Sequence, residues 1–168
     1  KEAIRCICAS LVEQREELNR IDGQMGDGDI GITVSHGSAQ ILAALDTMEG
    51  DFGKVLLACA QLAIKSRASS FGTLAATGLM AMAKVCMGRS EITAGELAEM
   101  LGAATDKMAM RGKSTIGDKT VLDAIDAVRA VVAASDGNDD LAATADRAAA
   151  EALERFREWA GRRHPDRL

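Results

Sequence analysis

No proline occurs in this chain of 168 residues before Pro165. Proline lacks a backbone N–H and clashes with the preceding helical turn, so its absence leaves the body of the chain free to form uninterrupted helices. Hydrophobic residues make up 48% of the chain but aromatic residues only 2%. The core must therefore consist of Ala, Leu, Ile, Val and Met, which pack well between helices. The sequence predicts an all-α fold.

Apolar residues recur at helical spacing through most of the chain. Ile4, Cys8 and Leu11 lie on one face of residues 1–20, with charged side chains opposite, as in an amphipathic helix. Helices are predicted in this way over residues 1–20, 31–48, 53–66, 71–88, 94–109, 118–134 and 138–160. Because short connections favour antiparallel neighbours, we expect one domain over residues 1–168, an antiparallel bundle or barrel of about seven to eight amphipathic helices.

Charge and hydropathy exclude several classes of protein. The net charge of −5 at pH 7 argues against a nucleic-acid partner, which needs clustered Lys and Arg. The longest apolar run, residues 71–88, contains Lys84 and indicates a buried helix rather than a membrane span. No signal peptide is visible, so we expect a soluble, cytoplasmic protein. The four cysteines show no CxxC spacing and are predicted to be reduced core thiols.

A glycine-rich acidic loop follows the first predicted helix. Residues 20–33 place Asp22, Asp27 and Asp29 among four glycines. Carboxylates are the ligands that Mg²⁺ prefers, and magnesium sites usually combine one or two of them with substrate phosphates. The helix that starts after the loop offers backbone N–H groups to an anion. The loop therefore predicts a magnesium–phosphate site.

Two other interpretations of this loop compete with that one. Asp-Gly-Asp is common as a solvated turn, although the third Asp and the density of glycines favour a site. A calcium EF-hand loop beginning at Asp27 would need Gly at its sixth position and a bidentate Glu at its twelfth. Gly31 falls at the fifth position and Ser38 at the twelfth, so the EF-hand is excluded.

Two serines precede the apolar helix predicted over residues 71–88. Ser69 and Ser70 lie immediately before it, where Ser residues commonly cap a helix start. The N–H groups of the same helix end could instead receive a phosphate. Capping is the favoured interpretation when this segment is considered alone.

A basic turn at residues 111–120 contains Gly-Lys-Ser. It is not a P-loop, because the first glycine of that motif would fall on Lys107 and no strand is predicted before it. Asp118 is predicted to be the N-cap of the following helix. Arg111 and Lys113 then face either solvent or an anionic ligand.

Taken together, three motifs resemble the nucleotide-binding L subunit or domain of dihydroxyacetone kinases. They are Asp22 with Gly26-Asp27-Gly28-Asp29-x-Gly31, then Ala68-Ser-Ser-Phe-Gly72, then Arg111-Gly-Lys-x-x-x-Gly-Asp-Lys-Thr-x-x-Asp123. Their order and spacing agree over roughly residues 1–160. The related fatty-acid kinase nucleotide domain shares the Asp-Gly-Asp loop, but the Gly-Asp-Lys-Thr segment fits dihydroxyacetone kinases better.

The resemblance implies an antiparallel barrel of eight helices with a nucleotide, ADP or ATP, at one end. It implies Asp22, Asp27 and Asp29 as ligands of two Mg²⁺ ions. The implied nucleotide contacts are Ile30, Gly31, Thr33, Ser69, Ser70, Phe71, Gly72, Gly112 and Val121, the last two beside the adenine. No catalytic side chain is implied, because phosphoryl transfer depends mainly on positioning and on metal ions.

The resemblance also implies a kinase component that works with a partner. A separate K subunit or domain would hold a short ketose such as dihydroxyacetone. The phosphoryl donor would be exchangeable ATP or a phosphotransferase-system protein, and the assembly a homodimer or hetero-oligomer. The alternative function is a non-catalytic regulatory module that binds a K subunit or a transcription regulator.

The chain departs from the family pattern at several positions. Ile30 stands where a His is often found, and Phe71 stands where a small hydroxyl residue is expected. The basic Gly-Arg-Ala stretch and the Ser-Ile-Gly and Asp-Pro-Gly motifs of the family have no counterpart before Leu168. The chain also begins at Lys1 rather than Met. We therefore expect a fragment or processed chain whose C-terminal end is truncated, or a barrel that lacks its last helix.

Overall fold

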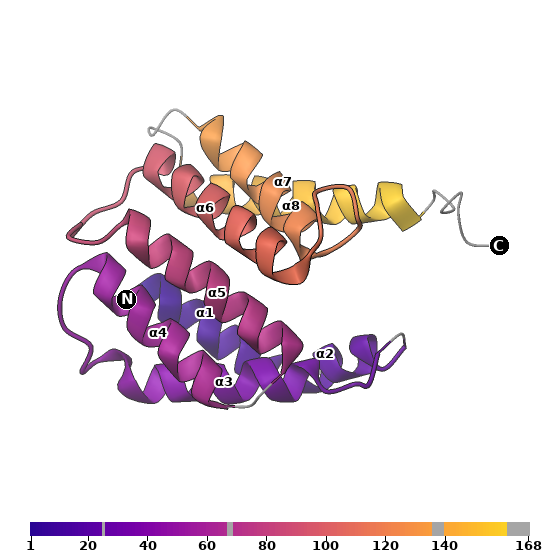
Figure 1. Ribbon diagram of the computed structural model, residues 1–168, viewed down its shortest axis with the longest axis horizontal. Helices are drawn as coiled ribbons and strands as arrows, with labels where there is room; N and C mark the ends of the chain where they lie inside the picture. Colours follow the sequence, from indigo (N-terminus) through magenta and orange to yellow (C-terminus); the bar gives the residue numbers. More distant parts are fainter. Residues whose placement is uncertain (25, 67–68, 136–139, 161–168) are drawn as a thin grey trace.

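The computed structural model describes residues 1–24, 26–66, 69–135 and 140–160, and every regular element in these ranges is an α-helix (Figure 1). The helices are α1 (Glu2–Glu13), α2 (Arg15–Asp22), α3 (Ile30–Leu45), α4 (Phe52–Ser66), α5 (Ser70–Val85), α6 (Ala94–Gly112), α7 (Val121–Ala133) and α8 (Leu141–Ala160). The all-α prediction is confirmed.

The first predicted helix is two helices in the structure. Gln14 separates α1 from α2, and its φ of −83° and ψ of 8° depart from α-helical values. Its N–H still donates to the Ser10 carbonyl at 2.9 Å, and its carbonyl accepts from the Leu18 N–H at 2.9 Å. Neither proline nor glycine marks this bend in the sequence. The pattern of apolar residues therefore could not reveal it.

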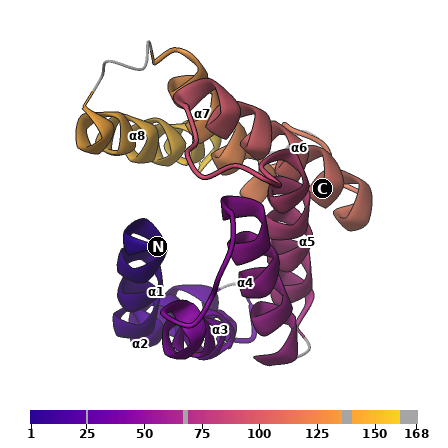
Figure 2. The same cartoon turned by 90° about the vertical axis from the view of Figure 1, so that its left-hand side faces the viewer.

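The helices form an open curl rather than a closed ring. From α3 onward each helix packs against the next, while α1 and α2 both pack against α3. Consecutive long helices run in roughly opposite directions (Figure 1). Figure 2 shows α1 and α8 at the two edges of the curl, and within the described ranges these two helices do not contact each other. The antiparallel bundle is as expected, and the described residues close no barrel.

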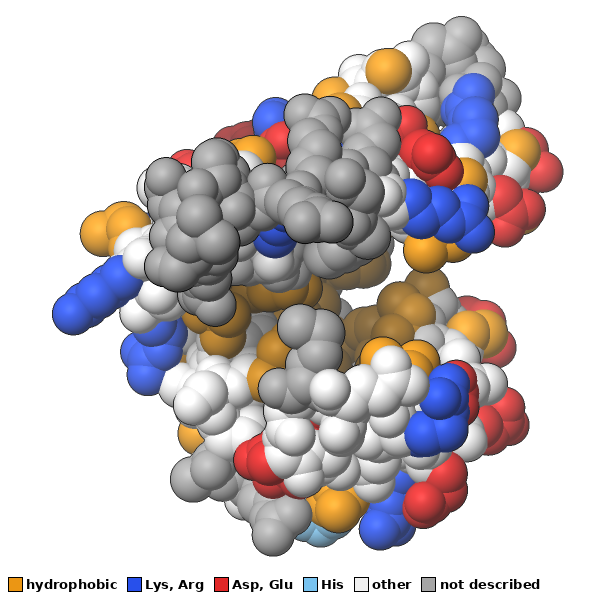
Figure 3. Space-filling model, turned by 90° about the vertical axis from the view of Figure 1, so that its right-hand side faces the viewer, with side chains coloured by type: hydrophobic (Ala, Val, Ile, Leu, Met, Phe, Trp, Pro, Cys, Tyr) orange, Lys and Arg blue, Asp and Glu red, His pale blue; other side chains and the backbone are white. Residues whose placement is uncertain are grey.

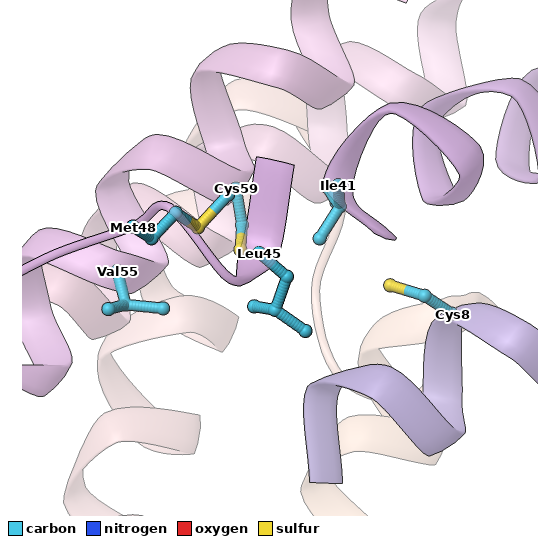
Figure 4. Close-up of a cluster of buried hydrophobic side chains, with 6 residues drawn as sticks. All are labelled: Cys8, Ile41, Leu45, Met48, Val55 and Cys59. Atoms are coloured by element: carbon cyan, nitrogen blue, oxygen red, sulfur yellow. The ribbon is translucent and has the colours of Figure 1, made fainter. Parts of the chain in front are cut away.

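Small hydrophobic clusters between neighbouring helices make up the core. Leu45 is fully buried in the first of them, and burial of such a side chain contributes about 1.5–3 kcal/mol. This cluster, shown in Figure 4, joins α1, α3 and α4 and contains Cys8, Ile41, Leu45, Met48, Val55 and Cys59. The second lies among α4, α5 and α6, and the third between α6 and α7. Each group of neighbouring helices in the curl is thus stabilised by its own hydrophobic cluster.

The cysteines are free thiols, but not all of them belong to the core. Cys8, Cys59 and Cys86 are buried as predicted. The prediction is wrong for Cys6, which is exposed because it lies outside the face of α1 whose Ile4 and Cys8 pack in the first cluster. Its thiol lies 3.9 Å from the Glu2 carboxylate. Among the described residues, no helix has the length and hydropathy that would let it span a membrane.

Candidate functional site

The structure brings the three aspartates of the acidic loop together. Asp22 is the last residue of α2, Asp27 lies in the loop, and Asp29 is the N-cap of α3. One carboxylate oxygen from each lies within 4.8 Å of the others. Asp27 is exposed, while Asp22 and Asp29 are half-buried. Three negative charges therefore converge on one point of the surface, which is the chemistry of a divalent-cation site.

Asp22 has a structural role as well. Its Oδ2 atom accepts hydrogen bonds from the Asp29 N–H at 3.0 Å and from the Ile30 N–H at 3.2 Å. The Asp29 side chain makes no capping bond of its own. Asp22 thus supplies from α2 the negative group that a helix N-terminus favours. Some of the N–H groups that we expected to face an anion are therefore already satisfied by the protein.

Asn19, on α2, makes a hydrogen bond to the first turn of α3. Its Oδ1 accepts a hydrogen bond from the Ile32 N–H at 3.1 Å. A Cβ atom at Gly31 would overlap the carbonyl oxygen of Arg15, so only glycine allows this close approach of α3 to α2. The sequence pattern did not single out Asn19, because it appeared as one polar residue on a polar helix face.

Thr33, in the first turns of α3, carries an unsatisfied group. Its side chain is only 4% exposed, and its hydroxyl is the one buried side-chain N or O atom in the described chain that lacks a hydrogen-bond partner. A buried polar group without a partner costs about 1–3 kcal/mol. Such an atom beside an acidic loop is favourably placed to receive a ligand group. Thr33 is one of the predicted nucleotide contacts.

The start of α5 confirms the capping interpretation of Ser69. Its hydroxyl oxygen accepts a hydrogen bond from the Gly72 N–H at 2.9 Å, and its carbonyl accepts one from the Thr73 hydroxyl at 2.9 Å. The helix begins at Ser70, one residue earlier than expected. Ser70 is exposed and Phe71 is partly exposed. The predicted phosphate contacts of this segment stay predictions.

The loop between α6 and α7 departs from prediction at its cap. Asp118 is not the N-cap of α7; its Oδ2 instead accepts a hydrogen bond from the Thr115 N–H at 2.7 Å. The N-cap is Thr120, whose hydroxyl accepts from the Leu122 N–H at 3.2 Å. The predicted adenine neighbours flank this loop, since Gly112 ends α6 and Val121 begins α7.

Asp123 completes the capping of α7 and is fully buried. Its Oδ2 accepts from the Thr120 N–H at 2.8 Å, and its Oδ1 accepts from the Gly117 N–H at 2.5 Å. Thr120 and Asp123 form a capping box, which a Thr-x-x-Asp sequence can signal. That signal was available, and it decides against Asp118 as the cap.

All three segments lie at one end of the bundle. Because the helices alternate in direction, the α2–α3 and α6–α7 connections lie on the right-hand side of Figure 1, and the first turn of α5 is at the end of that helix that faces the same side. The curl has two arms, formed by α1–α3 on one side and by α6–α8 on the other, which α4 and α5 connect. Figure 3 shows this end of the bundle, with a hollow between the two arms and hydrophobic side chains deep inside it. The acidic loop lies on one arm and the 113–120 loop on the other.

Comparison with known proteins gives a matching family and several relatives. The sequence model of the DAK2 domain matches residues 24–161. The chain is 29% identical over 119 residues to the "PEP-dependent dihydroxyacetone kinase 2, ADP-binding subunit DhaL" of Listeria innocua, covering 69% of this chain and 55% of that protein. It is 28% identical over 111 residues to the "PEP-dependent dihydroxyacetone kinase, ADP-binding subunit DhaL" of Escherichia coli, covering 66% and 53%.

A longer relative matches the same region. The chain is 30% identical over 123 residues to the mouse "Triokinase/FMN cyclase", covering 71% of this chain but 21% of that protein. The chain spans about half the length of the bacterial relatives it matches.

Proposed function

Because this chain belongs to the DAK2 domain family, we propose that it is the nucleotide-binding component of a dihydroxyacetone-type kinase. It binds ADP or ATP together with Mg²⁺, and the phosphoryl group passes to a short ketose held by a separate K subunit or domain. The names of the bacterial relatives support the nucleotide and the type of kinase. The proposal that Mg²⁺ binds is instead supported by the acidic residues of this chain itself.

The cluster of Asp22, Asp27 and Asp29 is the observation that carries the proposal. Oxygens around one Mg²⁺ lie within about 4.2 Å of one another, twice the usual ligand distance of about 2.1 Å. A spread of up to 4.8 Å is slightly wider than this, so it suits carboxylates that share two such ions or that move a few tenths of an ångström closer around one. Since one oxygen of Asp22 caps α3, its other oxygen is the one proposed to face the metal.

The surrounding residues offer a place for the nucleotide. The proposed phosphate contacts are Ile30, Gly31 and Thr33 on α3 and Ser69, Ser70, Phe71 and Gly72 at the start of α5. Two helix N-termini favour negative charge there, and the Thr33 hydroxyl, which has no hydrogen-bond partner among the described residues, supplies a polar group. Gly112 and Val121 are proposed to lie beside the adenine.

The chain contributes binding and orientation rather than a nucleophile. Bound Mg²⁺ would neutralise charge on the phosphate oxygens, which is the main assistance that phosphoryl transfer needs. The two arms of the curl hold the acidic loop and the 113–120 loop, so the phosphates and the base of one nucleotide would be oriented by different helices. No side chain of this chain is proposed to act as a catalytic acid, base or nucleophile.

The partners and the setting belong to the proposal as well. The bacterial relatives described above are named as PEP-dependent, and a relative from Lactococcus lactis, 26% identical over 114 residues, is named as PTS-dependent. These names favour a phosphotransferase-system protein as donor, with exchangeable ATP as the alternative. We expect a complex with a K subunit in the cytoplasm, either as a homodimer or as a hetero-oligomer.

Calorimetric titration with ADP and with ATP, each with and without Mg²⁺, tests the proposal. We expect binding that requires Mg²⁺ and that is lost in Asp27→Ala. Asp106→Ala, which removes an exposed aspartate of α6, is the matched control and should bind as wild type does. Nucleotide binding that is unchanged in Asp27→Ala would refute the metal assignment. Binding without turnover in a mixture with a K protein would instead favour the regulatory module.

A further inference from the structure

A buried carboxylate organises the loop that borders the proposed adenine position. Asp123 has an exposed fraction of 0%, and a buried carboxylate is unfavourable unless hydrogen bonds satisfy it. Its two oxygens accept from the Gly117 and Thr120 N–H groups. The bond to Gly117 spans six residues and goes beyond what the helix cap itself requires.

The loop has a backbone shape that the chain would rarely adopt unaided. Gly117 has a φ of 104°, and the non-glycine residues Lys113 and Lys119 have φ values of 51° and 60°. Positive φ values are uncommon for residues other than glycine. They persist when surrounding contacts fix them, and such positions cluster at ligand sites. Here the Asp123 carboxylate fixes the middle of the loop, and the Asp118 carboxylate fixes its beginning through Thr115.

The α6 capping box shows what an ordinary cap looks like in this protein. Thr93 and Glu96 form the same kind of box at the start of α6, at the opposite end of the bundle. The Glu96 carboxylate bonds the N–H and hydroxyl of Thr93 and pairs with Arg89 at the surface. The Asp123 carboxylate is buried and also bonds a loop residue upstream of the cap. The two boxes therefore form a natural pair for comparison.

We infer that Asp123 is a positioning residue for the nucleotide. It holds residues 113–120 in the shape that receives the adenosine part of the ligand, without touching the ligand itself. This inference rests on the proposed function, because it assigns the ligand of the loop. If the loop keeps the receptive shape only about a tenth of the time once Asp123 is lost, the apparent ADP dissociation constant rises about tenfold.

The test compares Asp123→Asn with Glu96→Gln in the full chain. Asparagine keeps the volume but offers an NH₂ donor in place of one acceptor, so one of the two loop bonds must fail. We expect about tenfold weaker binding of ADP with Mg²⁺ in Asp123→Asn and unchanged binding in Glu96→Gln. Amide exchange should become faster at Gly117 and Thr120 while the later turns of α7 keep their protection. Unchanged ADP affinity in Asp123→Asn would overturn the inference, as would equal weakening in both variants.

A second variant decides the question if Asp123→Asn does not fold. Gly117→Ala leaves the buried carboxylate in place, and its added Cβ atom meets no atom of the described residues within 4 Å, but it strains the backbone at a φ of 104°. ADP affinity should fall in this variant as well, and wild-type affinity would overturn the inference. Failure of the proposed function gives a different result, because the wild-type chain would then bind no ADP at all.

Discussion

The Asp22 carboxylate caps the helix that Asp29 begins, since its Oδ2 accepts the Asp29 N–H at 3.0 Å. Asp22 thus has a structural and a proposed ligand role, whereas exposed Asp27 has only the second. Asp22→Ala should lower the free energy of unfolding by about 1–2 kcal/mol. Asp27→Ala should leave it within about 0.5 kcal/mol of wild type. Urea unfolding measures both, and equal losses would contradict the separation of roles.

Gly31 is predicted to be intolerant of any side chain. A Cβ atom there overlaps the Arg15 carbonyl oxygen, so Gly31→Ala must push α3 away from α2 and should cost about 1–3 kcal/mol. Gly95→Ala is the matched control, because no atom of the described residues lies within 4 Å of its Cβ position. That variant should be neutral or more stable by about 0.4–1 kcal/mol. Thermal unfolding of both would show an equal effect if the close approach of α3 were unimportant.

Thr33→Val should separate stability from binding. The variant removes a buried hydroxyl that has no partner in the described chain, so the unliganded protein should keep or gain stability. ADP affinity should nevertheless fall, because the hydroxyl is proposed to contact the nucleotide. Thr105→Val is the control: its hydroxyl donates to the Leu101 carbonyl at 2.9 Å, so that variant should lose about 0.5–1.5 kcal/mol. A Thr33→Val protein with wild-type ADP affinity would remove Thr33 from the site.

The α6 cap makes stability depend on pH in one direction. Hydrogen bonds from the Thr93 N–H and hydroxyl hold the pKa of Glu96 below its ordinary value of 4.5. A carboxyl with a lowered pKa in the folded state stabilises the protein at pH above that ordinary value, and the contribution is lost as the pH falls through the folded-state pKa. In urea unfolding, the stability difference between wild type and Glu96→Gln should therefore stay constant from pH 7 to about pH 5 and shrink as the pH falls below the ordinary pKa of 4.5. A difference that is constant with pH would contradict this account.

The thiols should divide into two classes. Burial raises the pKa of Cys59 to about 11, and it also raises the pKa values of Cys8 and Cys86. Because the thiolate is the reactive form, a disulfide reagent near pH 8 should label one thiol rapidly in the native protein and four after unfolding. Cys6→Ser should abolish the rapid phase. Rapid labelling that persists in Cys6→Ser would mean that a buried cysteine becomes exposed.

The helices could be predicted from the sequence because local signals agree. The absence of proline and the apolar periodicity indicated every long helix, and the glycine-rich segment indicated where Asp22, Asp27 and Asp29 would meet. The bend at Gln14 left no such signal, since its helical hydrogen bonds continue on both sides. Whether α1 and α8 meet is also not a local property, and no pattern along the chain determines it.

The caps show why the details of the site were harder to predict. Asp118 and Thr120 are both good N-cap residues, and the preference for single cap residues did not separate them, although the spacing of Thr120 and Asp123 as a capping box favours Thr120. Burial of Asp123 settles the matter in the structure, because a carboxylate inside the protein must find two donors. Asn19 was missed for a similar reason: its partner, the Ile32 N–H, lies 13 residues away.

The open curl has a mechanical consequence for the two loops. α6 packs only against α5 and α7 in the described chain, so the acidic loop and the 113–120 loop are connected through α4 and α5 alone. Bending of that helical pair would increase or decrease the distance between the acidic loop and the 113–120 loop. A molecule that contacts both arms would link them directly, which the described residues do not do. Its binding should therefore reduce this motion.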